Sequence, residues 1–180
     1  MKVVGLVSGG KDSCYNLMQC VKNGHEIVCL ANLHSADGKQ ETDSYMYQTV
    51  GQNAVEYYAH AMGLPLYRQE IKGAARSRAL DYEPTEDDEV EDLYRLLKRV
   101  QEKHPQVQGV SAGAIWSEYQ TRRVRAVCVR LCLEPLCYLW RKDQTQLLQD
   151  MIQDGVNAIL IKVACLGLGP QHLGREGALH

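Results

Sequence analysis

The chain has 180 residues, 45% of them apolar, which is enough for one α/β domain with a buried core and too few for two. Its formal net charge is −2 and it has no block of Lys and Arg, which argues against direct binding to nucleic acid, because neutralising phosphates needs clustered cations. It has no signal-like start and no apolar run of the roughly 18 residues that a membrane helix needs. We therefore expect a cytoplasmic protein without membrane contact, whose partner is a small molecule or a folded protein.

Runs typical of strands alternate along the chain with amphipathic stretches typical of helices, the clearest of them over residues 87–103. This alternation predicts an α/β fold with a doubly wound, mainly parallel sheet, whose ligands bind at the carboxyl ends of the strands. We expect one domain over 1–168 and an irregular tail over 169–180. The strand-like runs are residues 3–7, 26–31, 64–70, 107–112, 135–140 and 156–163.

The first turn reads Ser-Gly-Gly-Lys-Asp-Ser over residues 8–13, between a β-branched run and a helix-like stretch that begins at Cys14. Its glycines allow positive φ and a close approach to phosphate, Lys11 adds a cation, and the serines add hydroxyl donors. The amides and the dipole of the helix start attract anions to the same place. The turn is therefore predicted to bind phosphate, and Ser8, Asp12 or Ser13 could also cap the helix.

Two longer polar connections, over 32–44 and 72–86, are predicted to emerge at the same edge of the sheet and to serve as substrate loops. An acidic run follows the second one. We interpret this run chiefly as a complement to the dipole at the start of the 87–103 helix, with Mg²⁺ binding or partner docking as weaker alternatives. The run includes Glu83, Glu86, Asp87, Asp88, Glu89, Glu91 and Asp92.

The seven cysteines are expected to be reduced, because their number is odd and the chain has neither a secretion signal nor a Cys-x-x-Cys pair. Cys128 and Cys132 lie four residues apart and could begin a metal site, but no further ligand follows at the necessary spacing. We interpret most of the cysteines as small buried apolar residues.

The spacing of the first turn differs from the G-x-x-x-x-G-K-[ST] of P-loop NTPases and from the G-x-G-x-x-G of dinucleotide sites. It resembles the S-G-G-x-D-S motif of the PP-loop ATP pyrophosphatases, which cleave ATP to AMP and pyrophosphate while activating an acyl or carbonyl oxygen. The resemblance implies a Rossmann-like fold of the adenine nucleotide alpha hydrolase type, with ATP and Mg²⁺ as cofactors. An ordinary glycine-rich turn with an incidental lysine is the less favoured alternative.

Beyond this turn, the chain resembles the diphthine–ammonia ligase family, whose members amidate diphthine on translation elongation factor two. The resemblance extends over almost the whole chain. Its matching segments are residues 43–49, 64–68, parts of 113–124, 135–140 and parts of 161–168.

The resemblance implies a role for each matching residue. Lys11 and Asp12 are predicted catalytic residues. Lys11 is expected to neutralise charge on the phosphates, and Asp12 to stabilise the loop or to bind Mg²⁺. The ATP site is predicted to comprise Ser8, Gly9, Gly10, Lys11 and Ser13, which bind the β- and γ-phosphates, with Ala31 and Asn32 beside adenosine. Residues predicted to bind the substrate are Ser44, Tyr45, Tyr47, Gln48, Gly113, Ser117, Tyr119, Gln120, Arg123 and Trp140.

Simpler interpretations of some of these residues stay open. The tyrosines near residue 45 could pack as edge aromatics, Ser117 could only cap a helix, and Trp140 could be a core aromatic. Arg123 or its neighbour Arg122 is expected to meet a phosphate or carboxylate in a bidentate manner.

The implied reaction is an ATP-dependent amide ligation. The diphthine carboxylate attacks the α-phosphorus of MgATP, pyrophosphate leaves, and ammonia displaces AMP from the acyl-adenylate. No amidotransferase domain is visible, so we expect free ammonium as the nitrogen source. The alternatives are a tRNA-modifying adenylase, which should carry paired cysteines or a basic appendage, an ATP-binding module impaired in turnover, and, most remotely, a structural protein without a ligand.

Two features depart from the family pattern. The family's glycine- and glutamate-rich motif, which ends in Tyr-Glu-Thr, belongs beyond His180, so we expect a chain truncated at its C-terminus. Arg125 stands where the family usually has an acid after Arg-Val, which reverses a charge beside the expected pocket.

Overall fold

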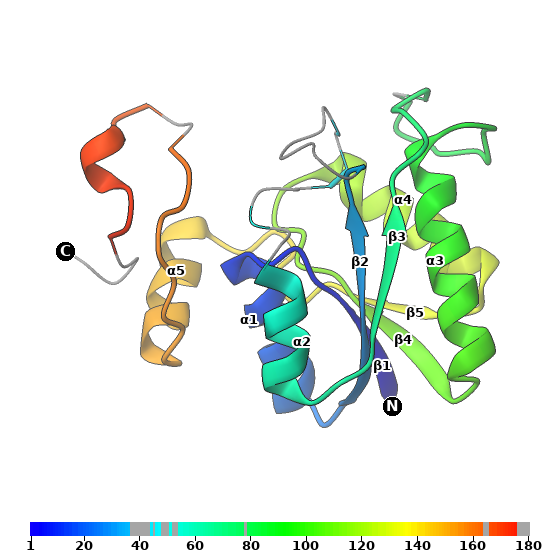
Figure 1. Cartoon of the computed structure of the whole chain (residues 1–180), viewed down its shortest axis with the longest axis horizontal. Coiled ribbons are helices and arrows are strands. Elements are labelled where there is room, and N and C mark those ends of the chain that lie inside the picture. The colour runs from blue at the N-terminus through cyan, green and yellow to red at the C-terminus, as the bar shows by residue number, and fades with distance from the viewer. Residues whose placement is uncertain are drawn as a thin grey trace. The chain divides into compact units, whose positions relative to one another are not determined.

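The structure is a computed structural model, shown in Figure 1. It describes residues 1–36, 44, 46–47, 51, 54–77, 79–163 and 166–175. The residues group into two compact units, Met1–Trp140 and Arg141–His180. The domain that we expect over 1–168 and the tail over 169–180 stay predictions.

The first unit contains a five-stranded parallel sheet in the order β3-β2-β1-β4-β5. The central strand β1 pairs with β2 on one side and with β4 on the other, so the strand order reverses between β1 and β4. This arrangement confirms the predicted doubly wound parallel sheet. The strands are β1 (Lys2–Leu6), β2 (Glu26–His34), β3 (Leu66–Glu70), β4 (Val107–Ser111) and β5 (Glu134–Leu136).

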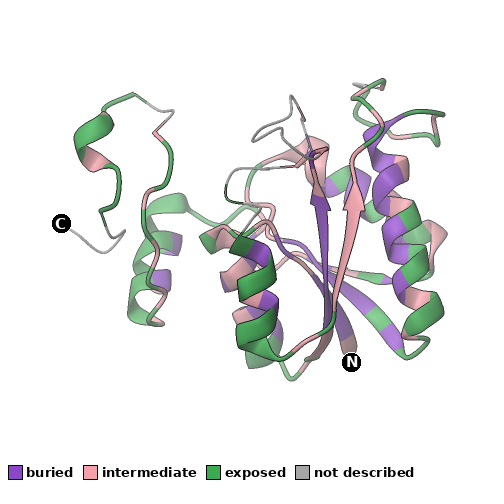
Figure 2. Ribbon diagram, viewed as in Figure 1, coloured by how far each residue is buried: buried purple, intermediate pink, exposed green. Residues whose placement is uncertain are grey.

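Helices cover both faces of this sheet (Figure 1). On one face, α1 (Lys11–Lys22) and α2 (Val55–Met62) pack through Leu17 and Val55 onto Leu30. On the other face, α3 (Glu89–Lys103) and α4 (Glu118–Arg130) pack onto Val4 and its neighbours. The central strands are therefore buried on both sides, as Figure 2 shows, which explains why they appear in the sequence as continuous apolar runs.

The α3 helix illustrates how the sequence forms these elements. Asp88 caps it, because the aspartate side chain accepts a hydrogen bond from Val90 N at 2.9 Å. One stripe is buried, formed by Leu93, Leu96, Leu97 and Val100. Acidic residues stand in its first turn and Lys103 in its last, which complements the helix dipole and confirms the helix predicted over 87–103.

The strand predicted over 156–163 is wrong as a member of the sheet, because this segment belongs to the second unit. There Leu160 N donates to Arg175 O at 2.9 Å, and Leu160 O accepts from Gly174 N at 2.8 Å. The backbone of this run is therefore hydrogen bonded to Gly174 and Arg175 of its own unit. That unit also contains α5 (Gln144–Gln153) and the short 3₁₀ helix η2 (Pro170–His172).

Candidate functional site

The turn after β1 presents the start of α1 to solvent. Gly9 has a φ of +83°, which a residue with a side chain rarely adopts, and this confirms the positive φ predicted there. The positive φ predicted for Gly10 is wrong, because its φ is −88°. Gly10 is the N-cap residue of α1, and no side chain caps the helix there. The amides of the first turn and the positive end of the dipole are therefore directed to one place, where an anion is favoured.

Two serine hydroxyls brace this turn from within. Ser13 Oγ accepts from Ser8 N at 3.3 Å and donates to Gly10 O at 2.9 Å. Gly10 N in turn donates to Ser8 Oγ at 3.3 Å. The two hydroxyls fix the shape of the turn, and the predicted cap by Ser8, Asp12 or Ser13 is wrong, because no side chain caps α1. The hydrogen bonds of Ser8 and Ser13 to phosphate stay a prediction.

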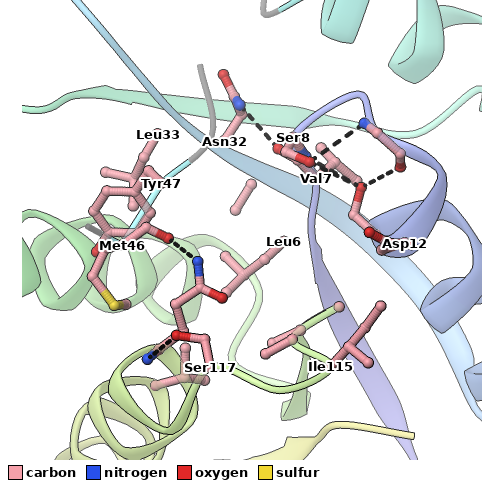
Figure 3. Close-up of a pocket in the computed structure, with 18 of the residues that line it drawn as sticks. Leu6, Val7, Ser8, Asp12, Asn32, Leu33, Met46, Tyr47, Ile115 and Ser117 are labelled. Carbon is pink, nitrogen blue, oxygen red and sulfur yellow. Dashed lines mark hydrogen bonds between the residues drawn. The ribbon is translucent and has the colours of Figure 1, made fainter. Parts of the chain in front are cut away.

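A cavity of about 310 Å³ opens beside the turn, within the size range of small-molecule sites (Figure 3). It lies at the carboxyl ends of β1, β2 and β4, where the strand order reverses, as the doubly wound fold predicts. Its lining comprises Leu6, Val7, Ser8, Gly10, Asp12, Ser13, Ala31, Asn32, Leu33, Met46, Tyr47, Ala112, Gly113, Ala114, Ile115, Trp116, Ser117, Gln120 and Val124.

Most residues predicted for the site are brought together in this lining. From the predicted ATP site it includes Ser8, Gly10, Ser13, Ala31 and Asn32, together with Asp12. From the predicted substrate site it includes Tyr47, Gly113, Ser117 and Gln120. Ser117 also caps α4, because its side chain accepts from Gln120 N at 3.2 Å, so the simple interpretation of this residue holds as well.

Other predicted residues are described but lie outside the lining, namely Gly9, Lys11, Ser44, Tyr119, Arg123 and Trp140. Tyr45 and Gln48 lie outside the described residues. The ligand roles assigned to all of these residues stay predictions.

Arg123 is fully buried, and its position explains why it does not reach the cavity. Its guanidinium donates to Ser77 O at 2.7 Å and to Ala79 O at 3.0 Å. It also stacks on Tyr119, 3.3 Å from the ring centroid. Arg123 therefore holds residues of the predicted 72–86 loop, and it is absent from the described lining of the cavity.

Trp116 is a cavity residue that the sequence analysis missed. It is 54% exposed and follows Ile115 in the loop after β4, whereas Trp140, the predicted aromatic wall, is absent from the described lining. The position of Trp116 between the matching residues Ile115 and Ser117 is the signal that could have identified it.

A buried polar network joins the turn to β2 and β3. Asn32 is 2% exposed, and its Nδ2 donates to Val7 O at 2.9 Å. Its Oδ1 accepts from Arg68 Nε at 3.1 Å, and Arg68 also pairs with Glu56 at 2.7 Å. Asn32 thus fixes the end of β2 against the residue that precedes the turn.

The wall opposite the turn is formed by Met46 and Tyr47 (Figure 3). Gln120 Nε2 donates to Met46 O at 2.9 Å, and the Tyr47 hydroxyl donates to Glu89 O at 3.2 Å. Burial raises the pKa of Tyr47 well above that of a free phenol, and the nearby carboxylates of Glu89 and Asp92 raise it further. Tyr47 is therefore a neutral hydrogen-bond donor at physiological pH.

Asp12 is the residue that fits the predicted Mg²⁺ best. Its carboxylate lies at the cavity and pairs with Lys11 Nζ, and both side chains are partly exposed. The described residues contain no cluster of three or more His, Cys, Asp or Glu that could hold a metal. Because Mg²⁺ usually takes one or two carboxylates together with substrate phosphates, Asp12 fits this ion as a partner of a bound triphosphate.

Within the part of the chain that the structure describes, no helix combines the length and apolar content required to cross a membrane.

Comparison with known proteins identifies relatives that all have the same name. The chain is 60% identical to diphthine–ammonia ligase of Danio rerio over 179 residues, which cover 98% of this chain and 70% of that protein. It is 56% identical to the Homo sapiens enzyme, covering 97% of this chain and 67% of the relative. It is 58% identical to the Schizosaccharomyces pombe enzyme, covering 98% of this chain but only 29% of that longer protein.

The family model described as "Diphthamide synthase N-terminal domain" matches residues 1–135, which include the whole lining of the cavity. With this match and these identities, the chain belongs to the diphthine–ammonia ligase family.

Proposed function

We propose that this chain binds ATP in the cavity and ligates ammonia to the carboxylate of diphthine on translation elongation factor two. The observation that carries the proposal is the start of α1, which has no side-chain cap and is approached through a glycine with positive φ at the mouth of a cavity. The names of the relatives supply the reaction class, because each is a diphthine–ammonia ligase.

In this proposal, the amides of the turn and of the first turn of α1 bind the β- and γ-phosphates of ATP. Lys11 neutralises part of their charge, and backbone groups of Ala31 and Asn32 receive the adenosine. Mg²⁺, held by Asp12 and the phosphates, would neutralise charge on the leaving pyrophosphate.

The chemistry has two steps. A carboxylate oxygen of diphthine forms a bond to the α-phosphorus, and the bond from this phosphorus to the bridging oxygen breaks, so that pyrophosphate leaves with the electron pair. The nitrogen of ammonia then attacks the acyl carbon, AMP leaves with the electrons of the C–O bond, and the nitrogen loses a proton to solvent. The chain contributes position and charge neutralisation to both steps.

The test is ATP-dependent AMP formation with diphthine-bearing elongation factor two and ammonium. Lys11→Ala should lower the rate on the order of 100-fold, the usual cost of one lost electrostatic contact in such a site. Lys22→Ala, at the other end of the same helix, is the matched control and should leave the rate unchanged. A Lys11→Ala rate within a few-fold of the parent would contradict the assigned role, and ATP-dependent thermal stabilisation without AMP formation would indicate a binding module instead.

A further inference from the structure

Three acids of the run at the start of α3 are buried, whereas from the sequence we interpret the run as a whole chiefly as a complement to the helix dipole. Asp88 and Asp92 are fully buried and Glu89 is 1% exposed. Burying carboxylates is costly unless their oxygens accept hydrogen bonds, so each of them must be compensated locally.

Asp88 and Asp92 are compensated by backbone amides of the preceding loop. Asp92 Oδ2 accepts from Lys72 N at 2.9 Å and Gly73 N at 2.8 Å. Asp88 Oδ2 accepts from Arg76 N at 3.0 Å and Ser77 N at 3.1 Å. These two carboxylates are therefore occupied in holding the loop against α3.

The carboxylate of Glu89 is instead connected by hydrogen bonds to the cavity wall formed by Met46 and Tyr47. Its Oε2 accepts from Ser44 Oγ at 2.7 Å. Ser44 Oγ in turn accepts from Met46 N at 3.1 Å and from Tyr47 N at 2.8 Å, and the Tyr47 hydroxyl returns to Glu89 O at 3.2 Å. Glu89 thus holds the two residues of this wall through one hydroxyl and through its own backbone.

The electrostatic surroundings of Glu89 agree with this role. Its Oε1 is buried without a hydrogen-bond partner among the described residues, and so is Arg123 Nε. Burial, and secondarily the charge of Asp88, raises the pKa of Glu89, while the hydrogen bond from Ser44, a backbone hydrogen bond from Met46 and the charge of Arg123 lower it. Because the bond from Ser44 favours the ionised carboxylate, losing it makes this acid harder to keep charged in its buried place.

We propose that Glu89 is a positioning residue for the cavity, which acts through Ser44 to fix Met46 and Tyr47 opposite the phosphate turn. Met46 and Tyr47 line the cavity on the side opposite Ser8 and Asp12 (Figure 3). In the proposed binding of ATP, a ligand whose phosphates occupy the turn would extend toward this wall. Glu89 therefore sets the affinity for the nucleoside part of the ligand and not for its phosphates. This inference rests on the proposed binding of ATP.

Calorimetry measures the affinity of the whole chain for ATP and for pyrophosphate. Comparing the two affinities distinguishes an effect on the nucleoside part of the ligand from an effect on its phosphates. Glu89→Ala and Ser44→Ala should each weaken ATP binding about tenfold and change pyrophosphate binding less than twofold. Combining them should cost no more than either alone, because they break the same connection. Glu89→Gln, which retains an oxygen acceptor for Ser44, should recover most of the affinity.

Glu91→Gln is the matched control, because Glu91 lies in the same turn of α3 but pairs with Arg130, at 2.7 Å, instead of with the cavity wall. It should lower stability without changing the ratio of the two affinities. If Glu89→Ala does not fold, Ser44→Ala tests the same connection with a smaller change.

In one outcome, the parent chain binds both ligands while the Glu89 and Ser44 variants keep its ratio of ATP affinity to pyrophosphate affinity. That result would overturn this inference and leave the proposed function intact. A parent chain that binds neither ligand would overturn the proposed function, and the inference with it.

Discussion

Gly113 lies directly against the backbone of Asp12. A methyl group on Gly113 would stand 2.8 Å from the carbonyl carbon and oxygen of Asp12 and from Ser13 N, closer than such atoms approach in proteins. The contact joins the loop after β4 to the first turn of α1, so the glycine is required by packing at the cavity and not by a special φ.

Gly113→Ala should therefore displace the phosphate turn. We expect a loss of about 1–3 kcal/mol in the free energy of unfolding, together with at least tenfold weaker ATP binding. Urea unfolding and calorimetry measure the two quantities. Gly109→Ala is the control, because its methyl group would meet Met1, Glu134 and Leu136 at 3.1–3.3 Å, away from the cavity. Normal ATP binding by Gly113→Ala would contradict this account of the contact.

The ion pair between Glu91 and Arg130 should make stability depend on pH. Arg130 donates to both carboxylate oxygens, at 2.7 and 2.9 Å, and these bonds lower the pKa of Glu91 from its usual 4.5. Since the folded-state pKa is the lower one, the contribution is present above about pH 4.5 and disappears as the pH falls through the folded-state value. Glu91→Gln should cost about 1–3 kcal/mol at pH 7.

Urea unfolding between pH 7 and pH 3 tests this dependence. The difference in unfolding free energy between the parent and Glu91→Gln should shrink steadily below pH 4.5. A difference that stays constant over the range would mean that the charge of Glu91 adds nothing to stability.

Asn16 should be one of the most important polar residues of the core. It is fully buried in α1, and its Nδ2 donates to Ser111 Oγ at 2.7 Å and Leu136 O at 2.8 Å, while its Oδ1 accepts from Tyr138 N at 2.9 Å. Asn16→Leu leaves these partners unsatisfied and should cost about 2–4 kcal/mol in thermal or urea unfolding.

Asn23→Ala provides the comparison for Asn16, because Asn23 is exposed at the end of the same helix and bonds only locally, to Gln19 O at 2.8 Å. It should cost less than about 1 kcal/mol. An equal loss of unfolding free energy in the two variants would show that the buried hydrogen bonds of Asn16 stabilise the fold no more than one exposed local bond does.

The cysteines should differ sharply in reactivity. Cys132 is exposed, whereas burial raises the pKa of Cys29 and of Cys128 to about 12. Since the thiolate is the reactive form, iodoacetamide at pH 8 should label Cys132 in the folded protein and reach Cys29 and Cys128 only after unfolding. Peptide mass analysis reads out each site, with Cys132→Ser as the control. Labelling of Cys29 as fast as Cys132 in the native protein would contradict the burial described.

The part of the site that local sequence signals predict is contiguous in the chain, whereas the predictions at residues 31, 32, 47, 113, 117 and 120 rest on the family resemblance. The turn over residues 8–13 follows from a strand, two glycines and a helix start, which are all local signals. The face that a helix presents is set by packing instead. Gln120 and Val124, one turn apart on α4, line the cavity, whereas Arg123 is rotated away toward residues 77 and 79. No local pattern shows which of these two directions faces the cavity.

The same limit explains the other differences. The run over 156–163 has strand character, but its partners are Gly174 and Arg175 in the second unit, and the sequence does not specify which backbone a strand will pair with. The acids of α3 fit a dipole argument equally well whether solvated or buried. Only the positions of Ser44 and of residues 72–77 reveal that Glu89 accepts from the Ser44 hydroxyl, and that Asp88 and Asp92 accept from backbone amides.

The strand order has a consequence for how the protein opens. Because β1 is the central strand, with two strands on each side of it, its amide protons should be the slowest of the sheet to exchange with deuterium. The turn over residues 8–13 directly follows this strand, whereas Met46 and Tyr47 are hydrogen bonded to Gln120 of α4 and to Glu89 of α3. In the proposed function, fluctuations that admit ATP can therefore move the wall formed by Met46 and Tyr47 and leave the amides of the turn in place.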